Sequence, residues 1–276
     1  MHHSKSRAHG PCYGLWRAVP CEDRVFYALC NPGQIMTSME TDHLRCIDSL
    51  QPTMVRVGQG NCHIWQWKLT DCSATLAALL QVLSADEQHR AHTFLAQPAR
   101  DTFVQVRAVL RLLLAERLNT AAADIRFQYG KFRKPALLEN SSDSHFNVAH
   151  SGDYALIAVA QGYEVGVDIE RMRAPRDLAS LAEIIMSPAE MQRWRKLPDQ
   201  ARIAAFFFAW TAKEAVSKAV GQGLQLDFAT LDTGIGQDGD TCDGVQVIAG
   251  EYGPCAFCSL AVPDGYSAAL ALRLAA

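Results

Sequence analysis

The sequence has no apolar run long enough to cross a membrane and no excess of basic residues. Its longest apolar runs, at 155–160 and 206–210, fall far short of the roughly 18–20 residues that a membrane helix needs. Its 276 residues carry a net charge of −3, so the overall balance favours neither nucleic acid nor membrane lipid as a partner. The first residues lack the apolar core of a secretory signal, and we therefore expect a cytoplasmic protein.

Several common catalytic motifs are also absent. No GxGxxG follows a strand and no GxxxxGK[ST] occurs, which argues against a Rossmann or P-loop phosphate cradle. No GxSxG elbow is present, so Ser151 is a poor candidate for a nucleophile. Among the nine cysteines, Cys255 and Cys258 form one CxxC, but no second CxxC and no nearby histidine completes a zinc site. We expect reduced thiols, with Cys258 buried in a strand.

The chain divides into three parts. Residues 1–53 show no sustained helical or strand period, and we expect a poorly ordered extension, with the natural start at Met36 or Met54. Beyond it, strand patterns, amphipathic helices and hairpin turns alternate, which predicts an α+β fold with antiparallel sheets. The expected halves are 54–160 and 161–276, the second carrying the acidic motifs.

The segment VGVDIE, residues 165–170, predicts a strand. Its valines and isoleucine alternate with Gly166, Asp168 and Glu170, so the two carboxylates project from one face about 6–7 Å apart. A solvated outer face would also explain two acids. Gly166, on the same face, allows another group to approach closely, and the pair is therefore a candidate metal site.

The segment WTAKEAVSK, residues 210–218, has a helical pattern instead. Thr211, Glu214 and Lys218 fall on one stripe, so a third carboxylate could meet the strand pair with an ammonium one turn away. Three carboxylates favour a hard cation such as Mg²⁺, and a neighbouring lysine suggests a phosphate. A surface ion pair between Glu214 and Lys218 is the simpler alternative.

Candidate phosphate ligands lie upstream. They are an arginine stripe on a predicted helix, a basic loop before Pro135, and a histidine in a turn, although surface or structural roles explain each of them equally simply. Together with the acids they suggest phosphoryl or phosphodiester chemistry with Mg²⁺. The residues are Arg100, Arg107, Arg111, Lys131, Arg133, Lys134 and His150.

These motifs, in this order and spacing, resemble the Sfp-type 4′-phosphopantetheinyl transferases. The resemblance covers roughly residues 62–274, and its most specific part is the D-x-E with the W-T-x-K-E-x-x-x-K. It also draws on FNVAHSGDYALIAVA at 146–160, SPAE at 187–190 and FFFAWTAKEAVSKAVGQGL at 206–224. It implies a pseudo-dimer of two similar α+β halves in one chain, a monomer with an internal pseudo-two-fold, with coenzyme A bound between the halves.

The resemblance also implies roles for individual residues. Asp168, Glu170 and Glu214 would hold Mg²⁺, or Mn²⁺, on the pyrophosphate of coenzyme A. Glu214 would also be the general base for a serine hydroxyl of an acyl or peptidyl carrier protein, and Lys218 would bind the pyrophosphate as 3′,5′-ADP leaves. His150 would contact the 3′-phosphate.

Arg100 and Lys134 would bind the nucleotide phosphates on the same resemblance. Two positions depart from the family pattern. Ala149 replaces a common serine, and the longer loop GKFRKP leaves Lys131 as an alternative to Lys134. Glu190 matches a family acid near the metal, but a capping box explains it.

The carrier itself is not identified by the sequence. Carrier proteins of this kind are usually acidic, and the segment 171–205 is basic, so we expect it to bind the carrier, with Met186, Met191 and Trp194 supplying apolar contacts. A solvated helix is equally compatible. Two other functions stay open: a non-catalytic protein that binds coenzyme A or a carrier, and a metal-dependent phosphodiester hydrolase.

Overall fold

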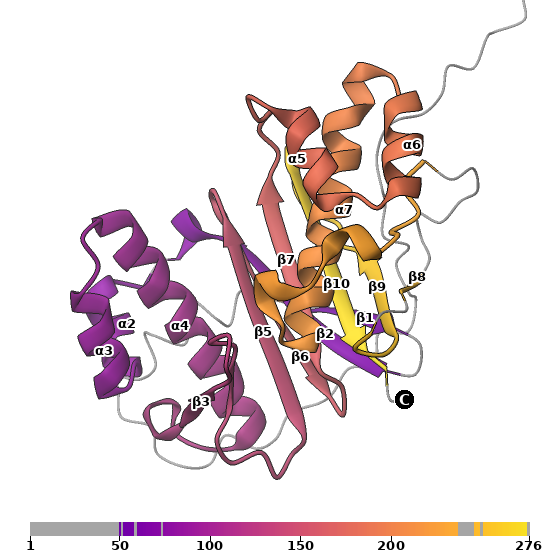
Figure 1. The fold of residues 1–276 in the computed structure, drawn as a ribbon. Helices are drawn as coiled ribbons and strands as arrows, with labels where there is room; N and C mark the ends of the chain where they lie inside the picture. The colour runs from indigo at the N-terminus through magenta and orange to yellow at the C-terminus, as the bar shows by residue number, and fades with distance from the viewer. Residues whose placement is uncertain are drawn as a thin grey trace, which may run out of the picture.

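The computed structural model describes residues 50, 52–57, 60–72, 74–236, 246–248 and 251–274. The expectation of low order over residues 1–53 lies almost entirely outside this part of the chain. Two four-stranded antiparallel sheets, each with its own helices, form the molecule (Figure 1). This confirms the predicted α+β class with two similar halves.

The N-terminal half has the strand order β1-β2-β6-β5, and its long helix packs on one face of that sheet with the two shorter helices packed against the long one. A two-stranded hairpin, β3-β4, lies beside it. The elements are β1 (Thr53–Val57), β2 (Gly60–Lys68), α2 (Leu76–Val82), α3 (Ala85–His92), α4 (Gln97–Leu118), β3 (Phe127–Tyr129), β4 (Pro135–Leu137), β5 (Ser144–Ser151) and β6 (Tyr154–Gln161).

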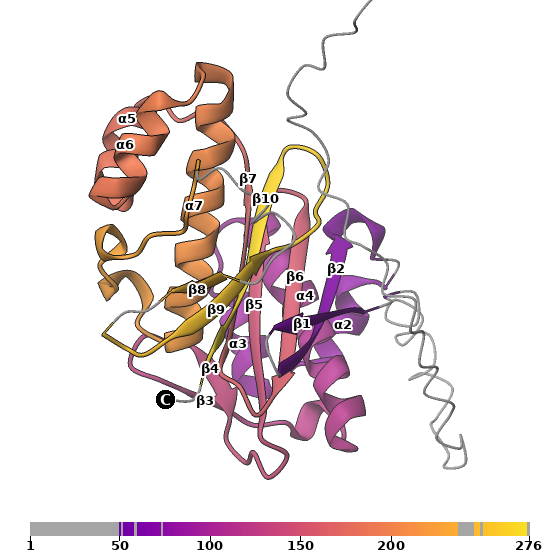
Figure 2. The same ribbon diagram turned by 90° about the vertical axis from the view of Figure 1, so that its right-hand side faces the viewer.

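The C-terminal half has the order β7-β10-β9-β8, and the long helix α7 crosses the face of this sheet (Figure 2). Helices α5 and α6 pack on α7 away from the N-terminal half. The elements are β7 (Val165–Arg171), α5 (Leu178–Ile185), α6 (Pro188–Lys196), α7 (Asp199–Val220), β8 (Gln246–Ile248), β9 (Cys255–Ser259) and β10 (Tyr266–Arg273).

The two halves meet along β5 and β7, and apolar side chains from both sheets form one core between them. The buried side-chain carbonyl of Asn147 on β5 accepts a hydrogen bond from the backbone N–H of Val167 on β7, at 3.0 Å. Such a bond satisfies a backbone donor on the free edge of β7, which would otherwise be buried without a partner. The junction therefore fixes β7 against the N-terminal half.

Local sequence signals account for most helix ends. Ser84 with Glu87 and Ser187 with Glu190 form capping boxes, and Pro188 occupies the first turn of α6. Helix α7 ends at Gly221, whose φ of +74° is the left-handed conformation that glycine favours. Within the described residues, none of the helices is both long and apolar enough to cross a membrane.

Some elements differ from the sequence prediction. Helix α5 and strand β4 were not predicted, because each is short and lies beside proline or arginine residues that favour loops. Cys258 lies in strand β9, as predicted, but its side chain is only partly buried. Cys255 on the same strand is the buried one of the two.

Candidate functional site

The candidate site begins with strand β7, whose two faces are both covered. Val165, Val167 and Ile169 pack into the core between the sheets, while the opposite face turns toward α7. Asp168 on that face is only 4% exposed. For Asp168 the alternative of a solvated outer strand face is therefore wrong.

Gly166 sets how closely α7 approaches this strand. A Cβ at Gly166 would lie 2.0 Å from the carbonyl oxygen of Ala215 and 2.4 Å from the backbone nitrogen of Ala219. No side chain fits there, so the helix backbone packs directly on the strand. The predicted close approach is confirmed, and it brings the last turns of α7 next to Asp168.

Lys218 joins the helix to the strand. Its Nζ donates to Oδ1 of Asp168 at 2.6 Å and to the carbonyl oxygen of Val167 at 3.2 Å. The ammonium is therefore engaged across the two elements, which the alternative of a simple surface pair with Glu214 does not explain. The second oxygen of Asp168, Oδ2, is buried and has no hydrogen-bond partner.

The carboxylates of the two elements influence one another. Burial raises the pKa of Asp168, opposed by Lys218 and reinforced by the negative charge of Glu170. Burial also raises the pKa of Glu214, with further upward contributions from Asp168 and Glu170 against the lowering effect of Lys218. Lys218 therefore offsets only part of the negative charge of the three carboxylates between β7 and α7.

The donor chemistry of this region fits a hard divalent cation, which prefers carboxylate oxygens. The buried, unpartnered Oδ2 of Asp168 is an oxygen that such an ion would satisfy. Across the part of the chain that the structure describes, no three His, Cys, Asp or Glu side chains are grouped as a metal site. The binding of one ion by Asp168, Glu170 and Glu214 together stays a prediction.

The turn between β5 and β6 reaches the same region from the N-terminal half. Ser151 Oγ donates to Oε2 of Glu170 at 2.8 Å. The neighbouring His150 is exposed, and its pKa is lowered, first by partial loss of solvent around the ring and then by the positive charge of Lys218. His150 is thus mostly neutral at pH 7, and its pKa responds to the charge of Lys218.

Lys134, which was predicted to bind a phosphate, contacts acceptors of the protein itself. Its Nζ contacts Oε2 of Glu164 at 2.8 Å and the carbonyl oxygens of Val165 and Ala219 at 3.0 and 3.4 Å. These three acceptors match the three donors of an ammonium. Lys134 therefore ties the β4 hairpin to β7 and to the end of α7. The alternative ligand, Lys131, is exposed.

The arginine stripe on α4 is neutralised from within the protein. The buried guanidinium of Arg111 contacts Glu87 at 2.5 Å, and Arg107 contacts the same carboxylate at 3.4 Å. One terminal nitrogen of Arg107 is nevertheless buried without a partner. Glu87 thus supplies negative charge to two arginines of the stripe, while Arg107 keeps one donor without a partner. Arg100 stays a prediction.

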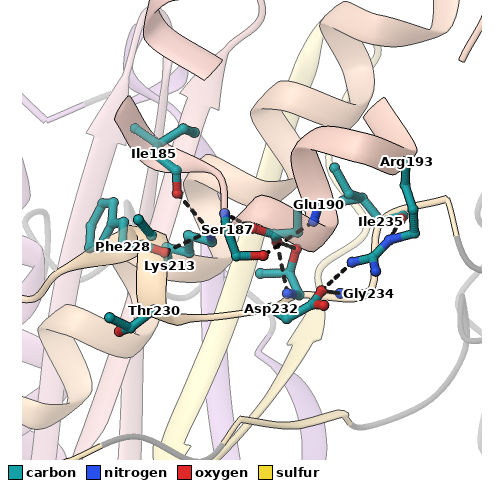
Figure 3. Close-up of polar contacts among 12 residues, drawn as sticks. Ile185, Ser187, Glu190, Arg193, Lys213, Phe228, Thr230, Asp232, Gly234 and Ile235 are labelled. Carbon is teal, nitrogen blue, oxygen red and sulfur yellow. Dashed lines mark hydrogen bonds and ion pairs between the residues drawn. The ribbon is translucent and has the colours of Figure 1, made fainter. Parts of the chain in front are cut away.

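Behind Glu214, the helix α7 is held by a fully buried ion pair (Figure 3). Lys213 and Glu190 are both 0% exposed, and their charged atoms lie 2.5 Å apart. Lys213 also donates to the carbonyl oxygens of Ile185 and Phe228, at 2.7 and 2.8 Å. The pair fixes α7 against α5, α6 and the following loop from the side opposite the candidate site.

Glu190 is fully occupied by this network. Its carboxylate accepts hydrogen bonds from the backbone of Ser187 and from the backbone and hydroxyl of Thr233. The capping box suggested by the sequence is confirmed. Lys213 was not predicted as the partner of Glu190, because the two residues lie on different helices. Glu190 thus has a structural role.

Comparisons with known proteins match both halves. Residues 65–162 match a family model described as 4'-phosphopantetheinyl transferase, N-terminal, and residues 164–271 match one described as 4'-phosphopantetheinyl transferase superfamily. The two matches meet where the two sheets divide.

Named relatives agree. The chain is 36% identical over 164 residues to 4'-phosphopantetheinyl transferase HetI of Nostoc sp., covering 59% of this chain and 69% of that protein. It is 27% identical to 4'-phosphopantetheinyl transferase ffp of Bacillus subtilis, covering 70% and 83% of the two chains. It is 28% identical to the human L-aminoadipate-semialdehyde dehydrogenase-phosphopantetheinyl transferase, covering 56% of each chain. The chain belongs to the 4'-phosphopantetheinyl transferase superfamily.

Proposed function

We propose that this enzyme transfers the 4′-phosphopantetheine arm of coenzyme A to a serine hydroxyl of an apo carrier protein, with Mg²⁺, releasing 3′,5′-ADP. The observation that carries the proposal is the contact between Lys218 on α7 and Asp168 on β7, beside Glu170 and Glu214. Carboxylates and a cation on two facing elements suit a pyrophosphate held with a divalent ion.

The proposed reaction forms one bond to phosphorus, breaks another and needs one group to accept a proton. The serine oxygen of the carrier forms a bond to the phosphorus that bears pantetheine, and the bond from that phosphorus to the bridging oxygen of the pyrophosphate breaks. The bridging oxygen leaves on 3′,5′-ADP. Glu214 takes the hydroxyl proton, and its raised pKa makes it a better base than an ordinary carboxylate.

The remaining residues neutralise charge. When bound, Mg²⁺ would supply positive charge at the pyrophosphate, and Asp168, Glu170 and Glu214 are the residues that would hold it. Lys218 lies where it can exchange its contact with Asp168 for a phosphate oxygen. His150, Arg100 and Lys131 would bind the other phosphates, and Lys134 would have to exchange its contact with Glu164 to join them.

For the carrier, we propose the surface of α5 and α6. Met186, Met191 and Trp194, which were expected to contact the carrier, are buried in the core of this half, so that part of the prediction is wrong. Leu181 and Ile184 on α5 are exposed instead, at 38% and 70%. The same segment carries four exposed basic residues, Arg173, Arg176, Arg195 and Lys196, of which Arg195 contacts Glu183, and positive charge beside apolar side chains suits an acidic partner.

The test is incubation with coenzyme A, Mg²⁺ and a panel of apo carriers, followed by mass spectrometry of the carrier. We expect a gain of one phosphopantetheine arm for wild type and none for Glu214→Gln or Asp168→Asn. Glu116→Gln, an exposed position on α4, is the matched control and should label normally.

Other outcomes would favour the alternatives. Release of 3′,5′-ADP from coenzyme A without any carrier would indicate a phosphodiester hydrolase. Binding of coenzyme A without transfer to any carrier would indicate a non-catalytic binding protein. Normal labelling by both variants would contradict the assignment of the site.

A further inference from the structure

The turn that joins β5 to β6 carries a hydroxyl whose direction is fixed by two partners. Ser151 Oγ accepts a hydrogen bond from the backbone N–H of Arg171 at 3.1 Å and donates to Oε2 of Glu170 at 2.8 Å. A serine hydroxyl has a single hydrogen, and here it points to Glu170. The contact crosses from the N-terminal half to the C-terminal half.

We propose that Ser151 is a positioning residue that holds Glu170 in the orientation needed to bind the divalent ion. The inference rests on the proposed function, because it assigns a role to Glu170 in that site. Glu170 lies near the end of β7 and is only half-buried, so its long side chain could otherwise turn toward solvent. Ordering a glutamate side chain has an entropic cost, which a fixed donor offsets before the metal arrives.

The β5–β6 turn is closely packed, as a positioning role for Ser151 requires. Gly152 has a φ of +56°, and a Cβ there would lie 2.5 Å from the hydroxyl oxygen of Tyr266 and 2.9 Å from Cδ of Arg171. That same tyrosine hydroxyl accepts a hydrogen bond from the backbone N–H of Asp153 at 3.0 Å. The turn is therefore packed against the ends of β7 and β10.

A contact between two aromatic rings also holds the β5–β6 turn in place. The rings of Tyr154 and Tyr266 meet edge to face, with their centroids 5.0 Å apart. One tyrosine belongs to β6 of the N-terminal half and the other to β10 of the C-terminal half. The position of Ser151 relative to Glu170 is thus set by packing between the halves and not by the turn alone.

The proposal explains why a poor candidate nucleophile lies at the site. Ser151 was not expected to form a covalent intermediate, and its hydroxyl is committed to Glu170. Partners of metal-binding carboxylates typically change metal affinity by about 10–100-fold when removed. We expect a loss in that range for Ser151→Ala.

The direct test measures Mn²⁺ binding by electron paramagnetic resonance, with the full chain and coenzyme A present and no carrier. Ser151→Ala should weaken Mn²⁺ binding about 10-fold or more, and Ser151→Thr, which keeps the hydroxyl, should restore it. Ser142→Ala removes a hydroxyl from the turn at the other end of β5 and should bind as wild type.

A double-mutant cycle separates positioning from a general structural effect. In a Glu170→Ala background, Ser151→Ala should cause no further loss of Mn²⁺ affinity, because the residue through which it acts is gone. Transfer assays should show a raised requirement for Mg²⁺ with a kcat that recovers at saturating Mg²⁺.

Three results would overturn the inference: wild-type Mn²⁺ affinity in Ser151→Ala, the same loss in both Glu170 backgrounds, or no Mn²⁺ binding by wild type. Failure of the proposed function looks different. In that case wild type would modify no carrier, while the effect of Ser151→Ala on Mn²⁺ binding would still be observed.

Discussion

Removing the buried ammonium of Lys213 tests whether the ion pair behind Glu214 holds the C-terminal half together. Lys213→Met keeps most of the side-chain length but leaves the carboxylate of Glu190 buried without a cation. It also leaves the carbonyl oxygens of Ile185 and Phe228 without their donor. Breaking a fully buried pair from one side costs about 3–5 kcal/mol, a large share of the roughly 5–15 kcal/mol by which domains are stable.

Urea unfolding, followed by circular dichroism at pH 7, measures this loss. With an m-value of about 2 kcal/mol/M, a loss of about 4 kcal/mol lowers the midpoint by about 2 M. Lys196→Met, an exposed position on α6, is the matched control and should shift the midpoint little. A free energy of unfolding for Lys213→Met within about 1 kcal/mol of wild type would refute the reasoning.

The partner substitution adds a pH test. Burial lowers the pKa of Lys213, and Glu190 opposes that shift. Glu190→Gln removes the opposition, so the folded state releases the Lys213 proton at lower pH than the unfolded chain does. Stability rises with pH wherever the unfolded state binds more protons, so the deficit of Glu190→Gln should shrink from pH 7 to pH 9. The double variant Lys213→Met/Glu190→Gln should be more stable than Lys213→Met alone, because it leaves no buried charge.

Three further predictions concern the contacts between the halves and between β7 and α7. Gly166→Ala forces α7 away from the strand and should cost at least about 1–3 kcal/mol in urea unfolding; wild-type stability would show that the helix yields freely. Glu164, whose pKa is lowered to about 2 first by His145, stabilises the fold above its unfolded pKa, and this contribution disappears as pH falls toward 2. Because Glu164 is 45% exposed, Glu164→Gln should lose only about 1 kcal/mol of stability at pH 6. The loss should be smaller at pH 3, where Glu164 begins to take up a proton, and smaller at pH 9, where His145 is above its raised pKa and has lost its charge. An equal loss at all three pH values would contradict this. Lys218→Met removes the charge that opposes the raised pKa of Asp168, so the acid limb of Mn²⁺ binding should move to higher pH, and an unmoved limb would contradict the coupling.

The extent of prediction from sequence differs between the site and its supports. The alternation in VGVDIE correctly placed Asp168 and Glu170 on one face, and Gly166 correctly marked a close approach, because strand period and glycine size are local properties. The environment of Lys134 could not be predicted. Its acceptors come from Glu164 and from backbone far along the chain, which only the folded arrangement brings together.

The sequence by itself determined most of the secondary structure, the family and the identities of the candidate ligands, since these depend on residue type and spacing. The tertiary structure decided which charges are paired. The fold pairs Lys213 with Glu190, Lys218 with Asp168 and Ser151 with Glu170, which lie 19–50 residues apart in the sequence. Burial and pairing depend on how β7, α7 and the β5–β6 turn pack, and no local pattern encodes that packing.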